Sequence, residues 1–191
     1  MKKILLATAL GAFVIQAQAA TFQFDLIGLA GTGLLPGNET GVVSGTPGRG
    51  GELGAGIFYD DVTDMLTLNV GWGSANGGVN LTGNTTGGHL HGPTTSGGVA
   101  AYSQNAGVKY GLNSLAGWNS SATAGGFSGT ISVLAADEAA LLNGQFYFNV
   151  HTAVNGGGEI RGNLVVVPEP SVVVLGVLGA GALLFRLRRR Q

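Results

Sequence analysis

Short segments of alternating apolar and polar residues recur through the middle of the chain. In 63–72 the apolar side chains occupy every second position, at Leu66, Leu68, Val70 and Trp72. The same alternation occurs in 22–26, 127–134 and 145–152. Because side chains alternate across a strand, this period places the apolar residues on one face. These four segments therefore predict half-buried β-strands.

The segments between these strands have the composition of turns. Glycine, asparagine, serine and threonine dominate 31–51, 73–88, 119–126 and 155–158. One segment differs, because 135–143 carries Asp137 and Glu138 near its start and is followed by Gly144, which predicts a helix of two turns. Many short strands with one short helix predict an all-β fold, an antiparallel Greek-key sandwich or barrel.

The first twenty residues have the pattern of a secretory signal peptide. Lys2 and Lys3 precede an apolar segment, 4–15, that is too short to span a bilayer. Ala17-Gln18-Ala19 then supplies the small residues that a signal peptidase accepts, so we expect cleavage after Ala19 or Ala20. The pattern predicts that the rest of the chain is exported.

The last segment, 167–191, combines three features in a fixed order. Pro168-Glu169-Pro170 ends the preceding element, an apolar helix is expected over 172–185, and basic residues follow at Arg186, Arg188, Arg189 and Arg190. With its flanking residues, the helix reaches only the minimum length for a membrane span. This order resembles the PEP-CTERM sorting signal of Gram-negative bacteria. The resemblance implies transient inner-membrane attachment, removal of the helix by an exosortase, and delivery to the cell surface or extracellular matrix. A permanent single-span anchor is the alternative.

Charge and composition between these ends exclude several functions. Residues 21–167 contain three basic and nine acidic side chains, a formal charge of −6, which argues against nucleic-acid binding. The chain has no cysteine, hence neither disulfides nor a catalytic thiol. Asp60, Asp61 and Asp64 lack the spacing of a calcium loop and are interpreted as a solvated turn. No nucleophile elbow or phosphate-binding loop is present, so no catalytic residue is assigned.

The three histidines of the chain fall on two predicted strands. His89 and His91 are two residues apart and share a face, while Leu90 points into the core. His151 lies opposite the apolar face of 145–152. The loop 153–157 is short enough for a hairpin, and alternation then places Glu159 and Arg161 on the outer face with His151.

Residues 53–164 resemble a CHRD domain, the module repeated in chordin and found alone in many secreted bacterial proteins. The residues that carry the resemblance are 89–93 (HLHGP), 141–144 (LLNG), 147–152 (YFNVHT) and 158–164 (GEIRGNL). The resemblance implies an immunoglobulin-like sandwich or barrel over 21–166, and a family without an agreed biochemical activity.

The histidines also suggest a metal site. Neutral imidazoles two apart on one strand, with a third from a neighbouring strand, suit Zn(II) or Cu(II), and Glu159 is the expected fourth or outer ligand. The pattern resembles the copper site of the Cu,Zn superoxide dismutases, but three histidines without cysteine cannot assemble that enzyme's bridged pair of metals. The alternative is that His89, His91 and His151 only hydrogen-bond to loops, to Glu159 or to each other.

Three functions remain open from the sequence. The first is a non-catalytic binding or structural module of the cell envelope or exopolysaccharide matrix, which needs no cofactor. The second is a zinc- or copper-binding protein, or an undescribed metalloenzyme, that uses the histidine face. The third is a carbohydrate-binding module in which an exposed Trp72 or Trp118 stacks on a sugar.

Overall fold

The strands form one continuous antiparallel sheet. The computed structural model describes residues 20–37, 39 and 41–168. The strands are β1 (Thr21–Gly28), β2 (Gly31–Thr32), β3 (Leu35–Pro36), β4 (Gly50–Asp60), β5 (Met65–Trp72), β6 (Thr85–His91), β7 (Val108–Gly111), β8 (Trp118–Ser121), β9 (Ala124–Ser132), β10 (Tyr147–Thr152) and β11 (Ile160–Val166). Their order is β7-β6-β10-β11-β1-β4-β5-β9-β8, with β2 beside β1 and β3 beside β11.

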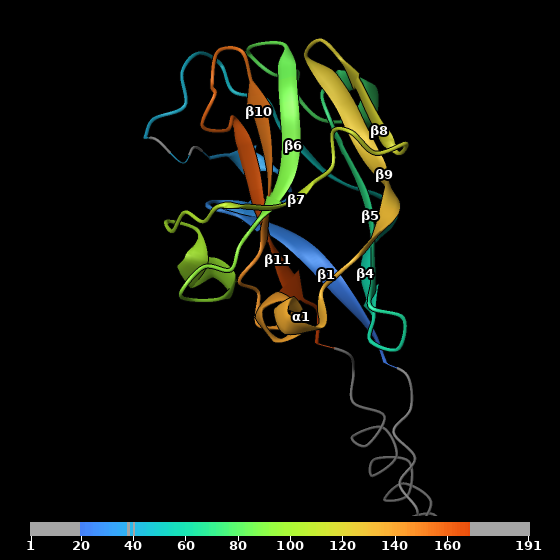
Figure 1. Ribbon diagram of the computed structural model, residues 1–191. Coiled ribbons are helices and arrows are strands. Elements are labelled where there is room, and N and C mark those ends of the chain that lie inside the picture. Colours follow the sequence, from blue (N-terminus) through green and yellow to red (C-terminus); the bar gives the residue numbers. More distant parts are fainter. Residues whose placement is uncertain (1–19, 38, 40, 169–191) are drawn as a thin grey trace, which may run out of the picture.

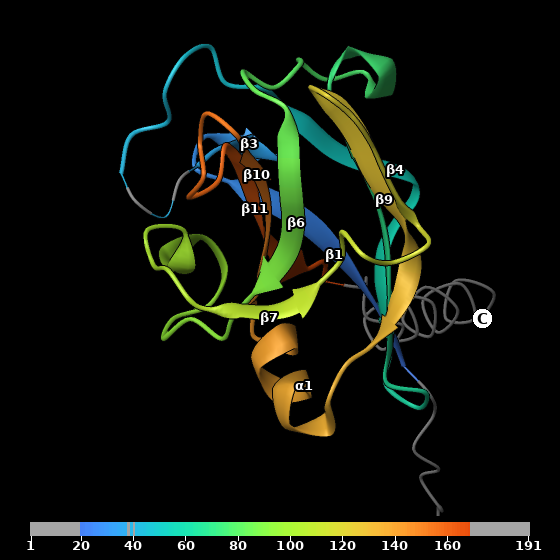
Figure 2. The same ribbon diagram turned by 45° about the horizontal axis from the view of Figure 1, so that its top comes forward.

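The sheet curls on itself into a half-barrel. Strands β6, β10 and β11 form one wall, β4, β5 and β9 form the other, and β1 crosses between them (Figures 1 and 2). The single α-helix of the described residues, α1 (Ala135–Leu142), lies at one end of the half-barrel (Figure 1). Two short 3-10 helices, η1 (Ser74–Asn76) and η2 (Gly98–Ala101), lie between strands. The prediction of an all-β antiparallel fold with one short helix is confirmed.

Strand β5 shows why the alternating pattern forms this sheet. Its apolar side chains, Leu66, Leu68, Val70 and Trp72, are fully buried between the walls. The residues between them face outward and bond to β9 across the sheet. The hydroxyls of Thr67 and Thr130 lie 3.0 Å apart, and Ser128 donates to Asn69 at 2.6 Å. Such cross-strand pairs stabilise the register that the buried face requires.

The two edges of the sheet approach each other at an aromatic contact. Trp118 of β8 stacks beside Trp72, with ring centroids 5.1 Å apart, and its ring reaches over Gly88 of β6. A Cβ at Gly88 would lie 2.3 Å from the Trp118 ring, so this close approach requires glycine. The contact closes the core between β6 and β8.

Three segments predicted as loops contain strand residues, and one of them, 73–88, includes the first residues of β6. Residues 119–126 belong to the tight β8–β9 hairpin, in which Ser121 pairs with Ala124. Residues 31–51 contain β2, β3 and the start of β4. These glycine-rich strands lack the alternating pattern of buried residues, and pairing with long neighbours stabilises them instead.

The predicted signal peptide, 1–20, and the sorting segment, 167–191, lie almost entirely outside the described residues. Of the sorting motif, only Pro168 is described, and it is exposed; Glu169, Pro170, the apolar helix and the four arginines are not among the described residues. Within the described part of the chain, no helix is long and apolar enough to cross a membrane. The described ends lie close together, since Val167 donates to the Gln23 carbonyl and Ala20 donates to Asp61.

Candidate metal site

Strand pairing places the three histidines on one wall of the half-barrel. In the pairing of β6 with β10, His91 lies opposite Tyr147 and His89 lies opposite Asn149. Residues directly opposite in an antiparallel pair share a face, so both histidines lie on the same face as His151. One nitrogen from each of the three rings lies within 4.8 Å of the other two. The structure thus brings together the three histidines that the sequence singled out.

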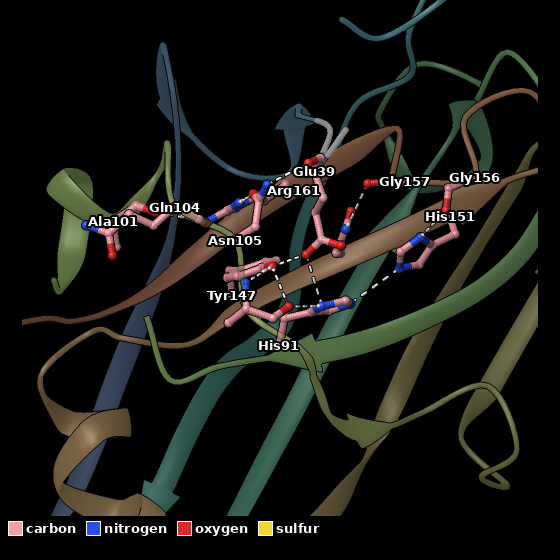
Figure 3. Close-up of polar contacts among 12 residues, drawn as sticks. Glu39, His91, Ala101, Gln104, Asn105, Tyr147, His151, Gly156, Gly157 and Arg161 are labelled. Carbon is pink, nitrogen blue, oxygen red and sulfur yellow. Dashed lines mark hydrogen bonds and ion pairs between the residues drawn. The ribbon is translucent and has the colours of Figure 1, made fainter. Parts of the chain in front are cut away.

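Hydrogen bonds to backbone carbonyls orient two of the imidazoles. His91 Nδ1 lies 2.9 Å from the Ala106 carbonyl, and His151 Nδ1 lies 2.9 Å from the Gly156 carbonyl (Figure 3). Because a carbonyl only accepts, the network assigns the proton of each neutral ring to Nδ1. The two Nε2 atoms therefore carry lone pairs, and they face each other at 3.3 Å. Two lone pairs at this distance repel unless a cation lies between them.

The surroundings keep these rings neutral. Burial lowers the pKa of His89, His91 and His151 below the ordinary 6.5. For His91 the pKa falls to about 4, since burial and the nearby His151, His89 and Arg161 outweigh the Ala106 carbonyl, which raises it. Neutral imidazole is the form that binds metals, so the cluster is ready to act as a ligand set at neutral pH.

A three-layer stack fixes the position of His91 from behind. The His91 ring stacks on Tyr147, with centroids 5.0 Å apart and planes inclined by 16°. The Arg161 guanidinium carbon lies 3.5 Å from the centroid of the same tyrosine ring (Figure 3). Arg161 also donates to the Ala101 and Gln104 carbonyls at 3.0 and 2.8 Å. The stack and these bonds immobilise the ring that presents Nε2 to His151.

The prediction that Glu159 and Arg161 lie on the face of His151 holds for Arg161, which pairs with Asn149 of β10, but the prediction that this face is an outer one is wrong. Both side chains are buried, with 0% and 1% exposed. The loop that includes Gly48 and the segment that includes Gln104 cover this part of the wall, as their hydrogen bonds to the two side chains show. The outer face of β11 is therefore a second, polar interior.

Glu159 does not belong to the histidine cluster. Its Oε1 accepts from the backbone N–H groups of Gly48 and Thr82, and its Oε2 accepts from Thr152 and Asn155. Burial raises its pKa, but these four donors outweigh that effect and hold the pKa below 4.5. Both carboxylate oxygens of Glu159 therefore accept hydrogen bonds from residues outside the histidine cluster. The expectation that Glu159 is a metal ligand or an outer partner of the histidines is not supported.

The carboxylate that contacts a ring of the histidine cluster is Glu39, which was not predicted from the sequence. Glu39 Oε1 lies 3.0 Å from His91 Nδ1 and accepts from the Tyr147 hydroxyl (Figure 3). Burial raises the pKa of Glu39, and the charge of Arg161 acts in the opposite direction. Glu39 lies in a loop without periodicity, and no spacing relates it to His91, fifty-two residues away.

The other candidates from the sequence have structural roles. Asp60 accepts from Val62 and Thr63 within its own turn, and Asp64 accepts from the Tyr59 hydroxyl, which supports the interpretation of a turn. Trp72 is completely buried and Trp118 is half-buried against it. Trp72 is therefore closed to sugar stacking, and Trp72 and Gly88 cover part of the Trp118 ring.

Comparison with known proteins now gives the family. The model of the CHRD domain matches residues 33–164. The chain belongs to the CHRD domain family. No curated protein and no solved structure matches it. The family match begins twenty residues before the resemblance seen in the sequence, and the added segment includes Glu39.

Proposed function

We propose that this CHRD domain binds one divalent transition metal, zinc or copper, through His89, His91 and His151. The observation that carries the proposal is the pair of unprotonated Nε2 atoms that face each other at 3.3 Å. Ligands of a tetrahedral zinc ion with bonds of about 2 Å lie roughly 3.3 Å apart. All three ligand nitrogens lie within 4.8 Å of one another, so binding of a metal requires the third ring to move closer to the other two.

The outer contacts support the same function. Metal-bound imidazoles usually donate their other N–H to a carbonyl or carboxylate, which fixes the tautomer and increases the basicity of the ligand nitrogen. His91 has both kinds of acceptor, in Ala106 and Glu39, and His151 has the Gly156 carbonyl. If the two histidines were purely structural, two unprotonated Nε2 atoms that face each other would only repel.

We further propose that the domain is a non-catalytic module that works outside the cytoplasm. The basic, apolar N-terminus and the order of motifs after Val167 support export by signal peptidase and sorting by an exosortase to the envelope or matrix. Fractionation of the source cells tests this, with wild type compared with a chain that lacks residues 169–191. Equal surface retention of both would contradict the sorting role.

A metal titration tests the binding proposal. Zinc, and separately copper, is titrated into the purified full-length chain at neutral pH, and the bound metal is counted by elemental analysis. We expect one ion per chain for wild type and none for His151→Ala. Asp61→Asn, which alters the acid-rich turn, is the matched control and should bind like wild type. No uptake by wild type, or equal uptake by His151→Ala, would overturn the proposal.

The effect of zinc on the free energy of unfolding shows whether His151 is a metal ligand or a purely structural residue. A metal that binds only the folded chain adds about 2.7 kcal/mol to the free energy of unfolding at a free concentration of one hundred times Kd. Wild type should show this gain on addition of zinc, and His151→Ala should not. If His151 only holds the hairpin, the substitution costs the same stability with and without zinc.

A further inference from the structure

Among the histidine, aspartate and glutamate side chains of the described residues, three supply donors to the histidine cluster and none supplies a fourth. The group of possible ligand atoms within reach of one another contains His89, His91 and His151 only. Glu159 faces the loops that it holds. Glu39 is bonded at Nδ1 of His91, on the far edge of the ring from Nε2, where it supports the ligand and does not itself coordinate.

Solvent reaches the cluster from one side. His91 is buried, with 2% exposed, whereas His89 and His151 are half-buried. A tetrahedral ion held by these three rings keeps its fourth position on that accessible side. Protein sites with three ligands and one exchangeable position differ in kind from structural sites, which use four protein ligands.

Two buried polar atoms beside the rings have no hydrogen-bond partner within the described residues. These are Nδ1 of His89 and Oδ1 of Asn149. Asn149 is completely buried and lies directly opposite His89 in the pairing of β6 with β10. Buried polar atoms in native proteins almost always have a partner. Oδ1 of Asn149 only accepts, so a partner at this atom must donate a hydrogen bond, as water or hydroxide does.

The charge around the cluster favours an anion in the open position. Three neutral imidazoles leave the double positive charge of the metal uncompensated. Arg161 adds a buried positive charge behind Tyr147, and Glu39 offsets one charge. The formal charge of the loaded site is therefore that of the free ion, and a negatively charged donor lowers the electrostatic energy.

We infer that the fourth position of the histidine site is open and takes an exogenous anionic donor, such as hydroxide or a carboxylate, from outside the chain. This inference rests on the proposed metal binding and defines what the metal is for. Through such a donor the CHRD domain binds anionic groups of other molecules, although its own formal charge of −6 over 21–167 repels them. The metal thus bridges an acidic module to an acidic ligand.

Cobalt substitution tests the open position, because the visible spectrum of Co(II) reports its ligands. The purified full-length chain is loaded with Co(II), and sodium azide is added at neutral pH. We expect a saturable change in the cobalt bands. Acetate should produce a similar change, and acetamide, its neutral counterpart of nearly the same shape, should produce at least tenfold less at equal concentration.

The outcomes distinguish this inference from the proposed function. Without cobalt uptake, both are wrong. Uptake with a spectrum that azide and acetate leave unchanged overturns the inference alone, because a protein donor then fills the fourth position. Glu39→Gln identifies that donor, since anion sensitivity that appears only in this variant shows that Glu39 coordinates. Equal responses to acetate and acetamide overturn the preference for anions.

Discussion

Replacement of the buried carboxylate of Glu159 by an amide is expected to destabilise the domain strongly. In Glu159→Gln the amide oxygen still accepts from the Gly48 and Thr82 N–H groups. The NH₂ group then faces Asn155 Nδ2, itself a donor, which lay 3.1 Å from the carboxylate. The Thr152 hydroxyl, formerly at 2.9 Å from Oε2, loses its charged acceptor as well.

The magnitude follows from these losses. Hydrogen bonds to charged groups contribute about 1.5–3 kcal/mol each, and a buried donor without an acceptor costs about 1–3 kcal/mol. One lost charged bond and one opposed donor pair give about 3 kcal/mol after partial relaxation. For a domain of this size, that loss lowers Tm by about 6–12 °C. Glu138→Gln, on the partly exposed first turn of α1, is the control and should change stability by less than about 0.5 kcal/mol.

Urea denaturation followed by circular dichroism measures both variants, and pH adds a second check. The folded-state pKa of Glu159 lies below the ordinary 4.5, so its stabilisation is complete above pH 4.5 and is lost as the pH falls through the folded pKa. The difference between wild type and Glu159→Gln should therefore be constant near neutral pH and shrink in acid. A neutral-pH difference below about 1 kcal/mol would refute the assignment of Glu159 as the group that holds the three loops.

Three further predictions concern the rest of the wall and the core. Because burial lowers the pKa of all three histidines below 6.5, zinc affinity should stay nearly constant from about pH 7.5 to 6.5 and fall in acid as the rings become protonated. A tenfold loss already between about pH 7.5 and 6.5 in calorimetric titrations would contradict this. Arg161→Ala removes a buried cation that donates to two carbonyls, and should lower the free energy of unfolding in urea by about 3 kcal/mol. A loss below about 1 kcal/mol would show that the stack on Tyr147 is dispensable. Gly88→Ala would place a methyl group 2.3 Å from Trp118 and should lower the free energy of unfolding by about 1–3 kcal/mol. Gly107→Ala, whose methyl group meets open space, is the control. Equal thermal stability of the two variants would disprove the close contact.

The histidine site was predictable from sequence in part. Alternation along two strands placed His89, His91 and His151 on matching faces, and the short loop after His151 predicted the hairpin of β10 with β11. The pairing of β6 with β10, which brings the two histidine strands together, could not be predicted from the local sequence pattern. Their sequence separation exceeds fifty residues, so only the packing of the whole core determines that they are neighbours.

The sequence by itself determined the class of fold, the residues of the apolar face and the place of the short helix, because these depend on side-chain alternation and on local backbone preference. It also contained the motifs that predict export and sorting. Tertiary structure alone decided what covers the other face of β10 and β11. Glu159 bonds the N–H of Gly48, 111 residues earlier in the chain, and Glu39 reaches His91 from the same distant region. An alternating pattern predicts which side chains share a face. The burial of that face depends on loops that contact it from distant parts of the chain, and such contacts leave no periodic pattern in the sequence.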